Sequence, residues 1–223
     1  MGTSATIDNE LSEQSAPFGE NMSTQSEIAE EDVLRARVYG LLSRALAEPP
    51  SDETLEIFRG LRSVDDMSVM GAAMKALGDL AVRTPRGAAE DEYTQLFHGM
   101  GAGGQVHPYA SYYLTGFIYE KPLADLRVDL VKLGATRSEA SKEPEDHIAF
   151  LCEIMHGLIL GTFGEPASLE RQQEFFNRHI ATWAVKYFED MESAESAVLY
   201  MPIGTLGKLF IAVEAEAFGM MAA

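Results

Sequence analysis

Apolar residues recur every three or four positions through most of the chain, and this spacing constrains the fold more than any other feature of the sequence. One stripe of this kind covers residues 33–46 and ends at Glu48-Pro49-Pro50, where proline stops a helix. No segment shows a convincing period of two, the pattern typical of a half-buried strand. The sequence therefore predicts an all-α architecture of about eight helices.

The other helices are predicted from the same spacing together with local start and stop signals. Ser51 is a suitable N-cap for the second helix, and Gly134 suits the position just after a helix. Pro144 is expected in the first turn of the helix that carries Ile148, where proline is tolerated. The apolar stripes that define these helices cover residues 55–61, 67–80, 90–97, 112–133, 148–159, about 168–191 and 206–213.

The chain is predicted to consist of a tail and a single globular domain. Residues 1–26 are rich in Ser, Thr, Asn, Gln and Glu, and their few apolar residues follow no period, so we expect a disordered acidic tail. Residues 27–223 are expected to form one all-helical domain, long enough to bury a core without a disulfide or a metal. Cys152 is the only cysteine, which excludes an intramolecular disulfide and fits a reducing compartment.

The acidity of the chain excludes several classes of partner. Asp and Glu number 35 against 17 Lys and Arg, a formal net charge of −18, so we expect no nucleic-acid partner and repulsion by anionic membranes. The first basic residue is Arg35, so the start of the chain does not resemble a secretory signal. No run of about twenty apolar residues suits stable membrane insertion. We therefore expect a cytoplasmic protein that attracts cationic partners.

Two short motifs suggest enzymes, but their contexts do not fit. The segment 99–104 has the letters GxGxxG, yet a helical pattern precedes it where a dinucleotide site needs a strand, so a flexible connector or a movable lid is the better interpretation. Glu153 and His156 match the ExxH element of di-iron bundles, but a second copy is missing. The five histidines have no ligand-like spacing. The sequence predicts no cofactor, no metal site and no catalytic residues.

The segment 143–147 places three carboxylates and an imidazole at the start of a strongly apolar helix. Acidic residues there stabilise a helix N-terminus, and this capping role explains part of the pattern. Three acids exceed what capping needs, however, and residues 93–119 contain no formally charged residue. Together the two segments predict an apolar, aromatic groove with an anionic rim, which suits a peptide that is both basic and hydrophobic.

Four segments spread over most of residues 33–190 together resemble the TorD/DmsD family of cytoplasmic chaperones for molybdenum-cofactor redox enzymes. Glu143-Pro144-Glu145-Asp146-His147 is the most specific, because it is similar to the family's E-P-x-D-H signature. The others are Val38-Tyr39-Gly40-Leu41-Leu42-Ser43, Tyr93-Thr94-Gln95-Leu96-Phe97 with the later His107-Pro108-Tyr109-Ala110-Ser111, and Phe176-x-x-His179-Ile180-x-x-Trp183 with Tyr187-Phe188.

The resemblance implies a non-enzymatic helical chaperone. It would bind the twin-arginine signal peptide or the apo form of a molybdoenzyme oxidoreductase, aid cofactor insertion and hold back export until folding is complete. It implies that Pro144, Asp146 and His147 lie in the signal-peptide site, and the peptide-binding residues predicted with them are Glu143, Tyr93, Phe97 and Tyr109.

Several questions stay open at this level. A helical metal- or cofactor-binding enzyme and a helical adaptor without chaperone activity are the alternatives. The identity of the client and the oligomeric state also stay open, and a monomer and a helix-swapped homodimer are both compatible with the sequence. The tail and the last helix carry no motif of the family.

Overall fold

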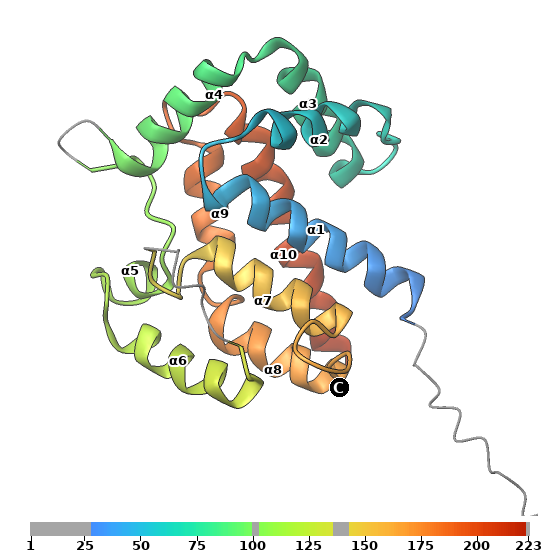
Figure 1. The fold of residues 1–223 in the computed structure, drawn as a ribbon, viewed down its shortest axis with the longest axis vertical. Coiled ribbons are helices and arrows are strands. Elements are labelled where there is room, and N and C mark those ends of the chain that lie inside the picture. The colour runs from blue at the N-terminus through green and yellow to red at the C-terminus, as the bar shows by residue number, and fades with distance from the viewer. Residues whose placement is uncertain (1–27, 100–102, 136–142, 222–223) are drawn as a thin grey trace, which may run out of the picture.

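The structure is a computed structural model that describes residues 28–99, 103–135 and 143–221. Over these residues it is all-α, as the periodicity predicts (Figure 1). The predicted acidic tail lies outside the described residues. The helices are α1 (Glu30–Ala47), α2 (Asp52–Gly60), α3 (Val69–Arg83), α4 (Arg86–Tyr93), α5 (Ala110–Thr115), α6 (Lys121–Leu133), α7 (Ile148–Leu160), α8 (Leu169–His179), α9 (Ala184–Glu192) and α10 (Tyr200–Met221), with a 3₁₀ turn at Leu61–Ser63 and a π turn at Thr94–His98.

Two of the predicted helices each divide into two, which raises the number above eight. The predicted helix 112–133 is interrupted after Thr115, where Gly116 takes the left-handed conformation with a φ of 85° and ends α5. The predicted helix 168–191 is interrupted after His179, because the indole N–H of Trp183 donates to the carbonyl of His179 at 2.7 Å. Pairing that carbonyl with a side chain lets the chain turn before α9 begins.

The remaining ends follow local signals that the sequence shows. The Ser51 hydroxyl accepts a hydrogen bond from Thr54 N at 3.2 Å and caps α2, as predicted. Gly134 follows α6 with a φ of 69°, also as predicted. The third helix begins at Val69, so Met67 precedes it and is exposed to solvent.

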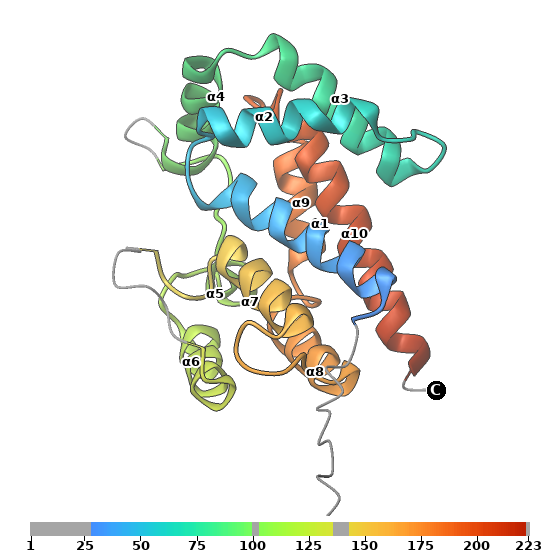
Figure 2. The same ribbon diagram turned by 45° about the vertical axis from the view of Figure 1, so that its right-hand side comes forward.

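The helices pack around a central pair. Helices α1 and α7 lie side by side, and α10 packs on α9 and on α3 (Figure 1). The turned view shows α2, α3 and α4 at one end of the molecule and α5, α6 and α8 at the other (Figure 2). No described helix is both long enough and apolar enough to cross a bilayer. The central core is made of fully buried side chains, including Tyr39, Leu42, Phe58, Leu151, Cys152, Met155, Tyr187, Phe188 and Ile211.

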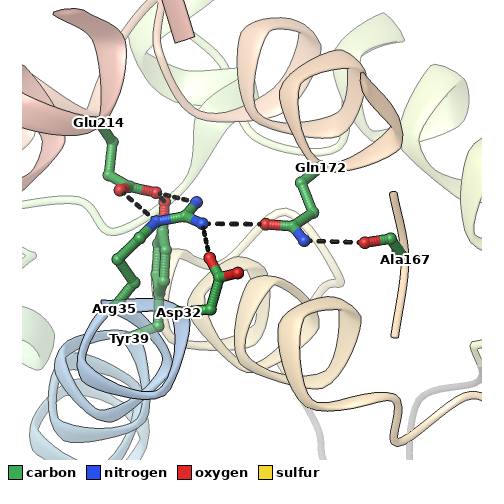
Figure 3. Close-up of polar contacts among 6 residues, drawn as sticks. All are labelled: Asp32, Arg35, Tyr39, Ala167, Gln172 and Glu214. Carbon is green, nitrogen blue, oxygen red and sulfur yellow. Dashed lines mark hydrogen bonds and ion pairs between the residues drawn. The ribbon is translucent and has the colours of Figure 1, made fainter. Parts of the chain in front are cut away.

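A partly buried cluster of polar side chains joins α1, α8 and α10. Arg35 forms a bidentate pair with Glu214, with Nε to Oε1 at 2.7 Å and a terminal nitrogen to Oε2 at 2.8 Å (Figure 3). The same guanidinium donates to Asp32 at 2.6 Å and to Gln172 at 3.2 Å. The Tyr39 hydroxyl donates to Glu214 at 3.0 Å. Burial opposes the charge of Arg35, but the bonds to Glu214 and Asp32 raise the pKa of Arg35 above its usual value.

A second buried carboxylate holds the start of α10 against α4. Glu92 accepts hydrogen bonds from the backbone N–H groups of Val198, Leu199 and Tyr200 at 2.7, 3.0 and 2.8 Å. These N–H groups precede or open the helix and have no partner within it, so the carboxylate acts as a cap supplied from a distant helix. This cap attaches the start of α10 to α4, at the end of the molecule that also contains α2 and α3.

Candidate functional site

The chain entering α5 and the chain entering α7 are joined at a junction that includes the predicted site residues Tyr109, Asp146 and His147. Tyr109 and His147 form an isolated antiparallel bridge. Ala110 N donates to the Asp146 carbonyl at 3.0 Å, and Ile148 N donates to the Pro108 carbonyl at 2.9 Å. This pairing holds the two loops in extended conformation just before each helix begins.

The prediction that Pro144 lies in the first turn of the seventh helix is wrong. Helix α7 begins at Ile148, and the carbonyl of Pro144 accepts a hydrogen bond from His147 N at 3.1 Å in a turn outside the helix. The reason is the bridge to Tyr109, which requires an extended backbone at His147, where φ is −65° and ψ is 133°. Periodicity places the helix correctly but cannot show that a partner segment delays its start.

Asp146 caps α5 rather than its own helix. Its Oδ2 accepts a hydrogen bond from Ser111 N at 2.8 Å, in the first turn of α5, and the side chain is completely buried. Its other oxygen, Oδ1, is buried with no hydrogen-bond partner among the described residues, and so is the Ser111 hydroxyl. A buried carboxylate that uses only one oxygen is uncommon in a folded protein.

His147 is the N-cap residue of α7. Its Nδ1 accepts a hydrogen bond from Ala149 N at 3.1 Å, which requires that nitrogen to be unprotonated. Burial lowers the pKa of His147 to about 4, and this outweighs the opposing effect of the Glu143 carboxylate. The imidazole is therefore neutral near pH 7 and stacks edge-on against Tyr109, with 5.4 Å between ring centroids.

The other two carboxylates of the segment meet partners from neighbouring elements. The Tyr109 hydroxyl donates to Glu143 Oε2 at 2.6 Å, and burial together with this bond raises the pKa of Tyr109. Arg127 of α6 pairs with Glu145 at 2.8 Å. The segment 143–147 is thus anchored to α5 and α6 through side chains as well as through the backbone.

Tyr93 and Phe97 belong to an adjoining aromatic cluster. Their ring centroids lie 4.7 Å apart, and both rings contact Tyr200 of α10. The Tyr93 hydroxyl donates to the carbonyl of Leu46 at 3.2 Å. Burial and the charge of Glu143 raise the pKa of Tyr93, so the cluster lies within electrostatic range of the junction.

The later aromatic motif also reaches this region. His179 Nε2 lies 3.0 Å from Asp129 Oδ2 of α6, and Arg178 pairs with the same carboxylate at 2.8 Å. Burial lowers the pKa of His179, although the bond to Asp129 opposes the shift. These contacts attach α6 to α8 and support the far side of the junction.

A pocket of about 180 Å³ lies among α5, α6, α7 and α8, beside the junction. Leu114 and Pro122 contribute to its apolar wall, and Asp125, Asp146 and Arg178 bring charges to it. Leu114 and Asp146 come from the two segments that predict a groove, whereas the contributions of α6 and α8 were not predicted, because no local pattern reveals how distant helices pack.

An apolar patch, which consists of Leu114, Phe117, Ile118 and Tyr119, is exposed next to that pocket. Phe117 is 69% exposed and Tyr119 is 65% exposed. Tyr119 also has a φ of 66°, the only positive value for a residue other than glycine in the described part of the chain. Large exposed apolar groups and an unfavourable backbone conformation are both costly, and their coincidence is typical of an interaction surface.

The ExxH motif has a structural explanation in the described residues. His156 Nδ1 is 2.7 Å from the carbonyl of Ala36 and attaches α7 to α1, while Glu153 is exposed. Residues 100–102 of the GxGxxG motif lie outside the described residues, but a π turn, not a strand, precedes Gly99, and Val106 N donates to the Leu96 carbonyl at 2.9 Å. The described residues contain no group of three His, Cys, Asp or Glu that could hold a metal.

The fold and the site together define an all-helical protein with an exposed apolar patch beside a pocket that is lined by both acidic and basic residues. Residues 65–189 match the family model of the nitrate reductase delta subunit. This match covers more than half of the chain, and the chain therefore belongs to that family. The resemblance to the TorD/DmsD chaperones, predicted from the four segments, is confirmed.

Known relatives match the chain over most of their length. The chaperone protein TorD of Vibrio atlanticus is 24% identical over 202 residues, which cover 82% of this chain and 93% of that protein. TorD of Photobacterium profundum is 24% identical over 185 residues, with 74% and 85% covered. The crystal structure of a proposed redox enzyme maturation protein from Archaeoglobus fulgidus shares the fold, with a TM-score of 0.55, 19% identity, and coverage of 86% and 99%.

Proposed function

We propose that this protein is a maturation chaperone for a molybdenum-cofactor oxidoreductase. It binds the twin-arginine signal peptide or the apo form of that enzyme, aids cofactor insertion and holds back export until folding is complete. The observation that carries the proposal is the family match over residues 65–189, together with relatives that are chaperones and that align over nearly their whole length. The protein is not an enzyme in this account, because its task is to bind a client.

The chemistry of the molecule supports a basic and apolar ligand. A twin-arginine signal offers two guanidinium groups and then an apolar stretch, and hydrogen bonds from arginine to carboxylates are stronger than bonds between neutral groups. The net charge of −18 attracts such a peptide over a distance. The junction supplies the carboxylate of Glu143, and the apolar patch lies on the same end of the chain's fold.

The predicted site residues divide into two roles in this proposal. Glu143, Phe97 and Tyr109 are partly exposed and are the groups that touch the peptide. The other predicted residues are buried, and they position the first group through backbone pairing and helix capping: Tyr93, Pro144, Asp146 and His147.

Calorimetric titration with a synthetic signal peptide tests the proposal. The peptide carries two adjacent arginines before an apolar stretch, and the matched control peptide has glutamine at both arginine positions. We expect the first peptide to bind more tightly, and its affinity to fall as salt rises, because the Debye length is roughly 10 Å at 0.1 M. Equal affinity for both peptides at every salt concentration would contradict the role proposed for the chain's net negative charge.

Affinity capture from the native cell tests the identity of the client. The tagged full-length chain is isolated, and the bound proteins are identified by mass spectrometry. A molybdenum-cofactor oxidoreductase in its apo form is the expected partner, and a different class of client would favour the alternative of a helical adaptor. The absence of any oxidoreductase, together with no binding of the signal peptide, would overturn the proposal.

A further inference from the structure

We propose that the apolar patch formed by Leu114, Phe117, Ile118 and Tyr119 is the docking surface for the apolar stretch of a cationic client peptide. This inference rests on the proposed function and adds a location to it. None of the four residues is among those predicted from the sequence as peptide-binding. The patch lies on the connection between α5 and α6, which the junction with α7 holds in place.

Leaving this apolar surface uncovered in water is energetically costly. Phe117 and Tyr119 are adjacent to Ile118 in sequence, and all three side chains are more than two-fifths exposed. Three large apolar neighbours on one connection exceed the scattered single residues normal for a surface. Tyr119 additionally holds a positive φ, a conformation that a bulky residue adopts only where its surroundings enforce it.

Charge selects among the possible occupants of the patch. Glu120 follows the patch directly. Asp125 lines the pocket that Leu114 also lines, but it pairs with Lys121, and Arg178 lines the same pocket, so the local charges are mixed and the long-range attraction comes from the chain as a whole. The whole chain carries a net charge of −18, so a second copy and an anionic membrane are both repelled. A peptide with basic residues beside an apolar stretch is attracted by the same charges and covers the same apolar side chains.

The backbone beneath the patch is held by hydrogen bonds. Asp146 caps α5, and the Thr115 hydroxyl donates to the Ser111 carbonyl at 2.8 Å and accepts from Phe117 N at 3.3 Å. The backbone that carries the patch is therefore held in one conformation before a ligand arrives. A surface that is ordered in advance binds with a smaller entropic cost.

The test is the double variant Phe117→Ser with Ile118→Ser in the full-length chain. The matched control is Met67→Ser with Val69→Ser, an apolar pair around the start of α3 that is even more exposed. We expect the patch variant to bind the twin-arginine peptide about tenfold or more weakly, because apolar anchors dominate such contacts, and the control to bind like the parent chain. Circular dichroism checks that both variants are folded.

A second peptide localises the effect. It keeps the two arginines but has serine throughout the apolar stretch. The parent chain and the patch variant are expected to bind this peptide equally, since the contact that distinguishes them is gone. A patch variant that binds the original peptide as tightly as the parent would overturn the inference while leaving the proposed function intact.

Two other outcomes separate the inference from its alternatives. If the parent chain binds neither peptide and captures no oxidoreductase, the proposed function itself fails. If the parent chain sediments as a dimer and the patch variant sediments as a monomer, the patch is a contact between copies of this chain and the inference is wrong.

Discussion

Two groups of polar side chains each join separate segments of the chain, but they differ in how completely their buried polar atoms are hydrogen-bonded. The cluster around Arg35 and Glu214 joins three helices, and both carboxylate oxygens of Glu214 accept hydrogen bonds (Figure 3). The junction around Asp146 joins two loops, yet one carboxylate oxygen and the Ser111 hydroxyl are left without a described partner. In the first group, both oxygens of the buried carboxylate are therefore used. In the second group, a buried carboxylate oxygen and a buried hydroxyl beside a pocket are not.

This difference separates a region that stabilises the fold from a region suited to ligand binding. A fully paired polar cluster fixes the register of the helices, because any shift leaves a charge buried without a partner. An incompletely paired junction contributes less to stability, and its neighbours include exposed apolar residues that only a ligand would cover. We therefore expect substitutions in the cluster to affect folding and substitutions at the junction to affect binding.

The largest expected effect is on stability, from Arg35→Ala. This substitution leaves the carboxylate of Glu214, which is 2% exposed, without its bidentate partner, and should lower the free energy of unfolding by about 3–5 kcal/mol. Urea denaturation measures the change. The control is Arg86→Ala, whose ion pairs are solvent-exposed, and its effect on the free energy of unfolding should be far smaller. Similar decreases in the free energy of unfolding for both variants would show that the Arg35 cluster contributes no more than an exposed ion pair.

The next effect is a loss of stability in mild acid. The pKa of His147 is about 4 in the folded chain against 6.5 for a free side chain, so the unfolded state binds a proton first as the pH falls. The folded state should lose up to about 3 kcal/mol between pH 6.5 and pH 4, and none of this loss is expected above pH 7. The lowered pKa of His179 acts in the same direction.

Denaturation curves at several pH values measure this dependence. His147→Gln keeps a side chain that can form hydrogen bonds but does not titrate, and should flatten the curve between pH 6.5 and pH 4. A variant with the same slope as the parent would contradict the assignment of the acid sensitivity to His147.

The fold class could be read from the sequence, because each helix carries its own apolar stripe and its own end signals. The boundaries that failed depend on contacts from elsewhere: Trp183 ends α8 by bonding the His179 carbonyl, and the bridge to Tyr109 delays α7. Local patterns contain no information on such partners. The same limit explains why the cap that Glu92 provides for α10 was not predicted, since 106 residues separate Glu92 from Val198.

The candidate site was partly predictable for the same reason. The segment 143–147 and Tyr109 stand out in the sequence, and the structure brings them together through the backbone. The exposed patch lies in the uncharged stretch already noted, but its residues have helical spacing and resemble a core stripe. Gly116 ends α5, and Phe117 and Tyr119, which follow this break in the helix, are exposed to solvent.

A smaller effect on stability is expected from Glu92→Gln. The carboxylate accepts three backbone N–H groups with its two oxygens, whereas the amide offers one oxygen and places an NH₂ group against the remaining donors. We expect a loss of about 2 kcal/mol, the range for a hydrogen bond to a charged group. Urea denaturation measures it, with Glu90→Gln on the exposed side of α4 as the control. Peptide affinity should stay unchanged, because this cap serves the stable region.

The smallest expected change in stability is that of Asp146→Asn, and it makes the comparison sharpest. Asparagine keeps an oxygen for Ser111 N, and its NH₂ group takes the place of Oδ1, which has no described partner to lose. The substitution also removes a charge from a fully buried position, which offsets part of any lost hydrogen-bond strength. The free energy of unfolding should therefore change by about 1 kcal/mol or less.

Binding should respond more than stability to this substitution if the junction serves recognition. A buried carboxylate acts on a nearby guanidinium through a medium of low dielectric constant, so its removal weakens the attraction more than an exposed charge would. We expect the twin-arginine peptide to bind roughly tenfold more weakly, equivalent to about 1.4 kcal/mol. Asp146→Ala is the structural control, because it also removes the acceptor for Ser111 N and should destabilise α5. The contrary result is that Asp146→Asn leaves the peptide affinity unchanged and lowers the free energy of unfolding as much as Glu92→Gln does. In that case the two regions would both serve stability, and the acidic segment would be only a helix cap.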